Sequence, residues 1–179
     1  MNQIRYITRD CKDKGKIENF LKRTRIGVIG MNGVGMNGVD FPYAVPVNFI
    51  WYDNAIFFHG MGSGKKENIL SEEPPVCFTV YAEYGTVTDP VPCHADTSYM
   101  SVMLFGKVKK VVDFEKAALV LNKLMEKYTP GYYQKPVNSK LVENYHSSFD
   151  GKGVSVYCLK PEDMTAKENQ ADESELFTE

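Results

Sequence analysis

The fold is decided by residues 43–70, which read YAVPVNFIWY (43–52), DN (53–54) and AIFFHGMGSGKKENIL (55–70). Two runs rich in β-branched and aromatic residues flank the short polar pair Asp53-Asn54, which is typical of a β-hairpin. The second run ends in a glycine-rich corner that opens into a basic segment compatible with a helix. The stretch therefore predicts a hairpin over residues 43–59 whose second strand turns into a short helix over residues 65–71.

The glycine-rich corner combines features that suit the binding of an anion. Its members are three glycines, one histidine and two lysines: Gly60, Gly62, Gly64, His59, Lys65 and Lys66. Flexible backbone N–H groups, an imidazole and two ammonium groups at one point favour phosphate. The lysines begin a helix, where cations oppose the helix dipole, and a bound anion would account for that placement. The alternative is an ordinary strand-to-helix loop with solvated lysines.

Two nucleotide-binding motifs are excluded. A Walker A loop needs a glycine five residues before Gly64, where His59 stands, and a serine or threonine where Lys66 stands. The segment 33–38 reads GVGMNG and matches the dinucleotide pattern G-x-G-x-x-G, but a proline and another strand follow it instead of a helix. The repeated Asn-Gly pairs in residues 31–40 predict a long hairpin loop instead.

Composition narrows the class of protein. The 179 residues fit one domain with a sizeable core, and 21 basic against 23 acidic residues give no sign of a nucleic-acid surface. The chain shows neither a signal peptide nor an apolar run long enough for a membrane span, so a cytoplasmic protein is expected. Four widely spaced cysteines indicate reduced thiols, and Cys93-His94 lacks the second ligand pair of a zinc site, so no metal is expected.

The remaining pattern predicts a mainly β domain. Strands are expected at residues 26–31, 76–84, 99–112 and 154–159, and helices at 16–24, 113–128 and 140–147. The first helix after the long strand has Asp113 as its N-cap. About six antiparallel, hairpin-linked strands without a βαβ rhythm indicate an antiparallel β-barrel with peripheral helices. This domain is expected over residues 1–165, followed by a disordered acidic tail over 166–179.

Several motifs resemble one known family. YAVPVNF (43–49), FFHG (57–60), the downstream GSGKK (62–66) and VCFTV (76–80) are similar to the FMN-binding split β-barrel proteins related to pyridoxamine 5'-phosphate oxidase. Cys93, YMSV (99–102) and Gly106-Lys107 resemble the corresponding segments of its nitroimidazole-resistance (Nim-like) branch. The resemblance covers about residues 17–160. The 31–40 loop is longer than the usual hairpin turn of the family, and Met100 stands where an arginine is common.

The resemblance implies a cofactor and its ligands. FMN is expected at the interface of a homodimer, with its phosphate on the corner and its isoalloxazine edge on the Val-Pro-Val-Asn segment. Carried over by position, the cofactor-binding residues are Val45, Pro46, Val47, Asn48, His59, Gly60, Lys65, Lys66, Tyr99 and Ser101. No side chain stands out as a general acid or base, so no catalytic residue is assigned.

The expected function follows from this cofactor. FMN would transfer hydride or electrons from NADH or NADPH to a small acceptor, nitroaromatic compounds included. Two alternatives stay open: a flavin- or haem-binding module without turnover, and oxidation of pyridoxamine phosphate. The last is disfavoured because the basic residues for a second phosphate are not evident.

Overall fold

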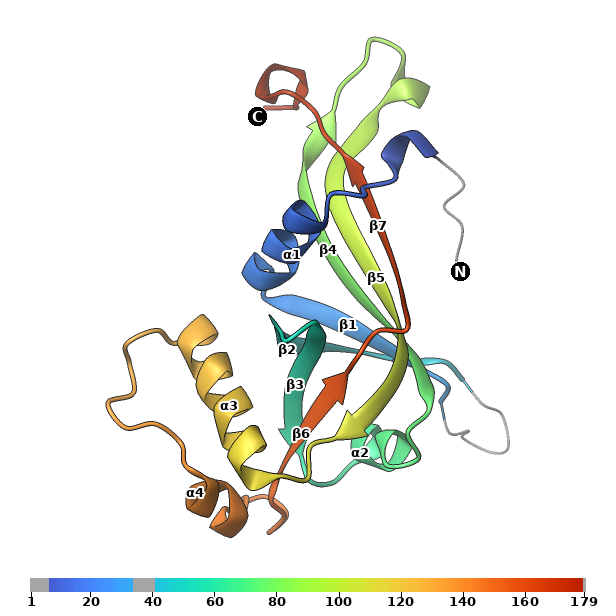
Figure 1. The fold of residues 1–179 in the computed structure, drawn as a ribbon. Helices are drawn as coiled ribbons and strands as arrows, with labels where there is room; N and C mark the ends of the chain where they lie inside the picture. Colours follow the sequence, from blue (N-terminus) through green and yellow to red (C-terminus); the bar gives the residue numbers. More distant parts are fainter. Residues whose placement is uncertain (1–6, 34–40, 179) are drawn as a thin grey trace.

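The computed structural model describes residues 7–33 and 41–178 (Figure 1). Its helices are η1 (Ile7–Arg9), α1 (Lys14–Arg23), α2 (Lys65–Leu70), η2 (Pro92–His94), α3 (Phe114–Tyr128), α4 (Ser139–Asn144) and η3 (Glu173–Glu175). Its strands are β1 (Ile26–Met31), β2 (Tyr43–Tyr52), β3 (Ala55–Met61), β4 (Pro75–Val87), β5 (Asp96–Lys110), β6 (Val154–Leu159) and β7 (Asp163–Asn169). The predicted hairpin and the short helix after it are confirmed. Most of the predicted 31–40 loop lies outside the described residues.

The strands close into an antiparallel barrel. Their order is β4-β1-β2-β3-β6-β5-β7, and β4 also pairs with β5, so six strands form a ring and β7 adds to β5. The long β5 bends to do this: its first part pairs with β4 and β7, and Val108–Lys110 pairs with β6. The predicted split β-barrel fold of about six antiparallel strands is confirmed, with β7 as an additional strand.

Two apolar clusters hold the barrel together. Aromatic rings fill its interior, where Phe58 stacks on Tyr157 at 5.1 Å between centroids and Phe78 meets Phe49 edge-on at 5.3 Å. A second cluster lies between α3 and the outer side of β3 and β6. As predicted, Asp113 caps α3, because its carboxylate accepts hydrogen bonds from the N–H groups of the first turn.

β2 changes partner at Phe49, and this change opens the barrel on one side. Residues up to Asn48 pair with β1, whereas residues from Phe49 onward pair with β3. β3 in turn pairs with β2 only as far as Phe58, and from His59 to its end its described pairing is with β6. The two strands of the hairpin therefore separate beyond the Phe49–Phe58 pair. Pro46 lies on the separated part, where a residue without an N–H costs no ladder bond to β3.

The end of α3 supports this point of separation. The Tyr128 hydroxyl accepts a hydrogen bond from the Phe49 N–H at 2.8 Å and also lies 2.9 Å from the Phe49 carbonyl oxygen. The Lys127 ammonium donates to the carbonyl oxygens of Thr24 (2.6 Å) and Phe49 (2.9 Å). Burial, and then the charge of Arg25, lowers the pKa of Lys127 to about 8. Side chains of α3 thus form hydrogen bonds with the N–H and C=O groups of Phe49, where β2 leaves β1.

The β4–β5 hairpin is longer than the sequence predicts. The strands expected here covered residues 76–84 and 99–112, but β4 continues to Val87 and β5 begins at Asp96. A shift of register between Glu83 and Gly85, whose φ is +142°, lets the ladder continue past the glycine. At Gly106 the backbone of another segment approaches β5 closely, since a Cβ there would lie 2.9 Å from the Lys160 carbonyl oxygen.

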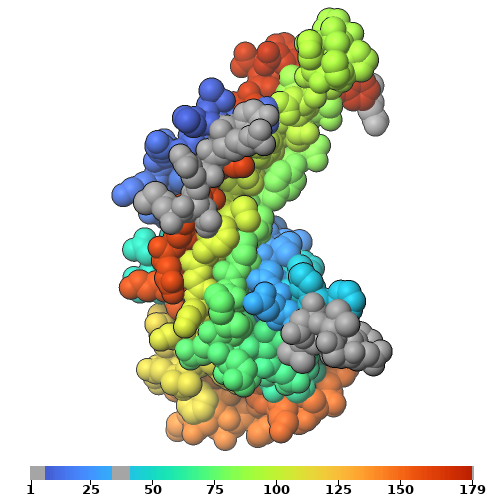
Figure 2. Space-filling view, turned by 90° about the vertical axis from the view of Figure 1, so that its right-hand side faces the viewer, coloured from blue at the N-terminus to red at the C-terminus, as the bar shows by residue number. Residues whose placement is uncertain are grey.

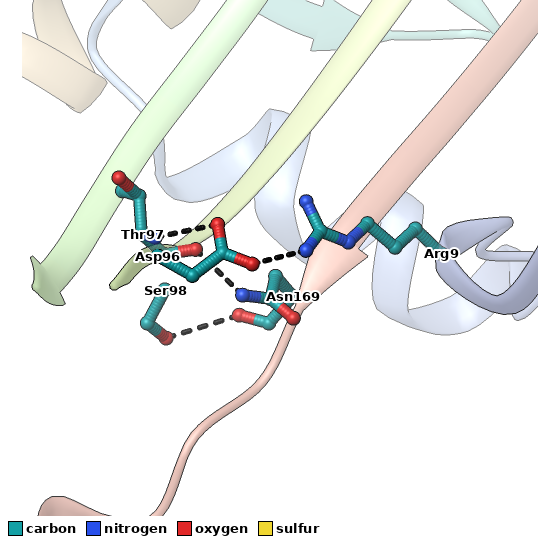
Figure 3. Close-up of polar contacts among 5 residues, drawn as sticks. All are labelled: Arg9, Asp96, Thr97, Ser98 and Asn169. Carbon is teal, nitrogen blue, oxygen red and sulfur yellow. Dashed lines mark hydrogen bonds and ion pairs between the residues drawn. The ribbon is translucent and has the colours of Figure 1, made fainter. Parts of the chain in front are cut away.

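The expected disordered tail over residues 166–179 is wrong for residues 166–169, which belong to β7. It is also wrong for residues 173–177, which form η3 and then hydrogen-bond to Thr86 and Thr88 at the end of β4. Every residue from Asp163 to Asn169 pairs with β5, and a polar network fixes the strand end (Figure 3). Asn169 donates from its amide to the Thr97 carbonyl oxygen at 2.7 Å, and the Ser98 hydroxyl donates to the Asn169 carbonyl oxygen at 3.0 Å. The hydrogen bonds to β5, which is distant in sequence, keep this strand ordered although its own sequence is polar.

The structure also bears on membrane association. No helix of residues 7–33 and 41–178 is long and apolar enough to cross a membrane.

Candidate functional site

The glycine corner joins the end of β3 to α2, on the side where the hairpin separates. Gly64 has a φ of +104° and precedes Lys65, the first residue of α2. Gly62 packs closely on the chain after α4, because a Cβ at this position would lie 2.5 Å from the Gly153 carbonyl oxygen. α2 has six residues, too few for its dipole to matter, so the attraction for an anion rests on the cations.

Lys66 lies directly over the backbone of the corner. A Cβ on Gly60 would meet the Lys66 Nζ at 2.7 Å, so only glycine leaves room for this ammonium group. Burial lowers the pKa of Lys66, and burial together with the charge of Lys66 lowers the pKa of His59. Both shifts mean that the surroundings disfavour the protonated, positively charged forms of Lys66 and His59. A bound anion would stabilise these charged forms.

The two lysines have no carboxylate within ion-pair distance among the described residues. Lys65 instead lies over the Tyr43 ring, with its Nζ 4.6 Å from the centroid, and Lys66 faces the Phe58 ring at 5.8 Å. The neighbouring Glu67 accepts from Lys110 through its Oε1 at 2.7 Å, and burial lowers the pKa of Lys66 by more than the charge of Glu67 raises it. The positive charge of Lys65 and Lys66 is therefore available to a ligand.

Buried polar atoms without a protein partner lie beside these lysines. In the described part of the chain, the Ser155 Oγ, the Tyr157 hydroxyl and the Glu67 Oε2 are buried and make no hydrogen bond. Ser155 is the strand partner of Gly60, and the Tyr157 ring comes within 4.0 Å of the position of a Gly60 Cβ. Buried hydroxyl groups nearly always have partners, so these two suit the polar atoms of a ligand.

Ser155 and Tyr157 were missed by the sequence reasoning. Their strand reads VSVYCL (154–159), in which a serine and a tyrosine interrupt an otherwise apolar run at alternate positions. That alternation places both on the barrel side, whereas Val156 packs toward α3. Only the register with β3, which is a long-range pairing, reveals that this side adjoins the corner.

The Val-Pro-Val-Asn segment lies on the separated part of β2. Val45 and Val47 turn inward, while Pro46 and Asn48 are exposed on the opposite face of the strand. Since this part of β2 pairs with β1 on one edge and has left β3 on the other, its free edge faces the same opening as the corner. The structure thus brings the predicted Val45–Asn48 segment and the predicted corner residues together in one chain.

Tyr99 and Ser101 do not join them. They lie near the start of β5, whereas α2 contacts the other end of β5 through Lys110, nine to eleven residues further along the strand. At about 3.3 Å per residue this is roughly 30–36 Å of strand, measured along the chain. Tyr99 packs on Tyr81 at 6.0 Å between centroids, and hydrogen bonding to Tyr99 and then to Asp96 raises the pKa of Arg9. Within one chain these two predicted residues are separate from the corner.

Cys93 and His94 also lie away from the corner, in η2 at the far end of the β4–β5 hairpin. His94 lies near Asp89, 3.4 Å away. Among the described residues no group of three side chains could hold a metal ion.

Comparison with known proteins agrees with this geometry. The family model described as pyridoxamine 5'-phosphate oxidase matches residues 13–168. No curated protein matches the chain at a significant level.

Several solved structures have the same fold. A putative 5-nitroimidazole antibiotic resistance protein from Bacteroides thetaiotaomicron is 25% identical, with a TM-score of 0.67 over 88% of this chain and 85% of its own. Two further structures show the fold alone. The flavocytochrome Anf3 from Azotobacter vinelandii is 23% identical (TM-score 0.76; 97% and 77% covered). The FAD- and haem-binding protein from Mycobacterium smegmatis is 18% identical (TM-score 0.71; 91% and 74% covered).

The motifs of the hairpin and corner, the split barrel and the match over residues 13–168 lead to one conclusion: this chain belongs to the pyridoxamine 5'-phosphate oxidase family.

Proposed function

We propose that this protein binds FMN and transfers electrons from a nicotinamide donor to a small acceptor, nitroaromatic compounds included. The observation that carries the proposal is the corner itself. Among the described residues, Lys65 and Lys66 have no carboxylate within ion-pair distance, and the Lys66 ammonium lies over Gly60, where a side chain would displace it. Beside them lie two buried hydroxyl groups without hydrogen-bond partners. A phosphate monoester supplies the negative charge and the acceptor oxygens that this group of residues needs.

The residues of the chain divide into two roles toward FMN. Lys65, Lys66 and His59 neutralise the phosphate, and the hydroxyl groups of Ser155 and Tyr157 donate to its oxygens or to the ribityl chain. The free edge of Val45–Asn48 offers backbone N–H and C=O groups to the polar edge of the isoalloxazine. When bound, the flavin supplies the chemistry of accepting and passing on a hydride. The protein positions it and excludes water.

We further propose a homodimer that covers one face of the sheet. The strand register aligns Pro46, Val28, Thr79 and Met103 across four neighbouring strands on the face opposite the barrel core. Ile26, Val28, Tyr81 and Met103 are all exposed apolar side chains. Figure 2 shows β7, β5, β4, β1 and β2 side by side in this order. A second copy is a natural cover for an apolar sheet face of this width.

The dimer also gives a role to Tyr99 and Ser101. Both share the exposed face with Pro46, because Ser101 is paired with Tyr81 and Tyr99 packs on the same tyrosine. Two such faces packed together bring the β5 residues of one copy toward the β2 segment of the other. In this arrangement Tyr99 and Ser101 complete the flavin site of the partner.

One experiment separates electron transfer from simple binding. FMN-loaded protein is mixed with NADH or NADPH without oxygen while its visible spectrum is recorded. Loss of the flavin absorbance, and its return on adding a nitroaromatic acceptor, is the expected result. A flavin that stays oxidised would favour a binding module without turnover. A Soret band in the purified protein would point to haem instead.

A further inference from the structure

Away from the corner, α1 lies beside the β4–β5 hairpin (Figure 1). A groove of about 850 Å³ runs there, bounded by α1 on one side and by inward-facing residues of β4 and β5 on the other. Its volume lies within the range of pockets for small organic ligands. The residues of the flavin site proposed above do not line it.

The floor of the groove is apolar. Phe20, Met100 and Ala82 line it, and the first two are almost fully buried. Tyr84 adds an aromatic ring with a hydroxyl group, and Asn19 adds an exposed amide from the helix. Such a surface accepts a flat apolar body and offers hydrogen-bond donors at its rim.

The charged side chains that line the groove differ in whether they already have a partner in the protein. The carboxylate of Asp13 caps α1 by accepting from the Lys16 N–H at 3.0 Å, and the Lys16 ammonium pairs with Glu168. The guanidinium of Arg23 has no hydrogen bond or ion pair to any residue of the described chain, although its charge lies close enough to Tyr84 to lower the pKa of that phenol. Burial outweighs this and leaves the pKa of Tyr84 raised, so the phenol stays a neutral donor.

We propose that this groove binds an organic anion with an apolar, planar body. The anionic group pairs with the guanidinium of Arg23 and accepts from the Tyr84 hydroxyl, and the apolar body lies along Phe20 and Met100. Arginine binds carboxylates, sulfonates and phosphates through two parallel N–H donors, which accounts for the unused guanidinium at the end of an apolar floor.

The test compares two fluorescent probes that share one aromatic body. 8-Anilinonaphthalene-1-sulfonate carries the anionic group, and N-phenyl-1-naphthylamine lacks it. Both are titrated into the FMN-loaded full chain and into the flavin-free chain. The sulfonate is expected to bind at one site per chain and more tightly than the neutral probe, in both forms. Equal affinities for the two probes would overturn the proposal. Binding of the sulfonate that is lost on loading FMN would also contradict it, because the probe would then occupy the flavin site.

Variants assign the site. Arg23→Gln should weaken sulfonate binding roughly tenfold and leave the neutral probe unaffected, since it removes only the ion pair. Lys14→Gln is the matched control, because it makes the same charge change on the same helix outside the groove. Equal effects of the two substitutions would exclude Arg23 as the anion ligand.

Filling the groove provides an independent check. Asn19→Trp adds bulk from the exposed side of α1, and Ala82→Phe adds it from β4, so both should weaken both probes at least fivefold. Asn19 is exposed, so its replacement leaves the core intact even if Ala82→Phe lowers the melting temperature. Retention of full affinity in Asn19→Trp would overturn the assignment of the groove.

Discussion

The two ends of the molecule use polar groups in opposite ways. At the far end of β5, the groups of Figure 3 satisfy one another: Arg9 pairs with Asp96, and Asn169 bonds both Thr97 and Ser98. At the glycine corner, the half-buried Lys66 has no carboxylate within ion-pair distance among the described residues. The comparison distinguishes polar groups whose mutual hydrogen bonds stabilise the fold from polar groups that the fold positions without a protein partner. The second kind marks a place for a ligand.

The largest expected effect is on flavin binding by Lys66→Ala. Removing the ammonium from the corner should weaken FMN about 30- to 100-fold, in line with the loss of a charge-assisted hydrogen bond in a partly buried site. The stability of the flavin-free protein should stay equal or rise, because burial disfavours the charge of Lys66 in the free state. Fluorescence titration with FMN and urea unfolding measure the two quantities.

Lys107→Ala is the control for this substitution. Lys107 is an exposed lysine of β5 and has the same charge. A loss of FMN affinity equal to that of Lys66→Ala would mean that only overall charge matters.

Two glycine-to-alanine changes sharpen the comparison. Gly27→Ala places a Cβ 2.3 Å from the buried ring of Phe78, and overpacking of this kind should lower the free energy of unfolding by about 1–3 kcal/mol. Gly60→Ala meets only the flexible end of Lys66, so it should displace the ammonium, weaken FMN and leave the fold stable. Thermal unfolding measures the stability of both variants, and FMN titration measures their affinity for the cofactor. A Gly60→Ala protein as unstable as Gly27→Ala would show that the corner is structural.

A smaller effect is expected at the far end of β5. Asn169→Ala removes the amide donor to the Thr97 carbonyl oxygen and should cost about 0.5–1.5 kcal/mol of unfolding free energy. Urea unfolding measures it, with Gln170→Ala as a control one residue further along the chain. A change of less than 0.3 kcal/mol, roughly the limit of such measurements, would show that the network of Figure 3 does not hold β7 in place.

The smallest effect concerns pH. The pKa of His59 in the folded protein lies below its ordinary value of 6.5, so the unfolded chain binds more protons between the two values. The stability of the flavin-free protein should therefore fall as the pH decreases from 6.5 through the lower pKa, and His59→Gln should reduce this slope. Urea unfolding at several pH values tests this, with His94→Gln as the control. Parallel pH profiles for wild type and His59→Gln would contradict it.

The sequence was sufficient where the signals are local. The Asp53-Asn54 turn, the glycines before Lys65 and the cap at Asp113 each act within a few residues, so the hairpin, the corner and α3 could be predicted.

What could not be predicted depends on pairing between distant segments. β7 is polar in sequence and exists because β5 offers it an edge, and β4 extends through Gly85 because the register shifts there. Ser155 and Tyr157 become part of the candidate site only through the register of β6 with β3. Tyr99 and Ser101 were grouped with the corner by family resemblance, and in one chain they lie near the opposite end of the 15-residue β5 from Lys110, which contacts α2.

The central claim is that the corner holds the phosphate of FMN, and riboflavin tests it most directly because it differs from FMN only in lacking that phosphate. Affinities for both ligands are measured for the wild type, for Lys65→Ala with Lys66→Ala, and for Lys107→Ala with Lys109→Ala as the control. The wild type and the control should prefer FMN by roughly a hundredfold or more, and the preference should fall to a few-fold in the corner variant. A preference for FMN that survives in the corner variant would place the phosphate elsewhere and contradict the account.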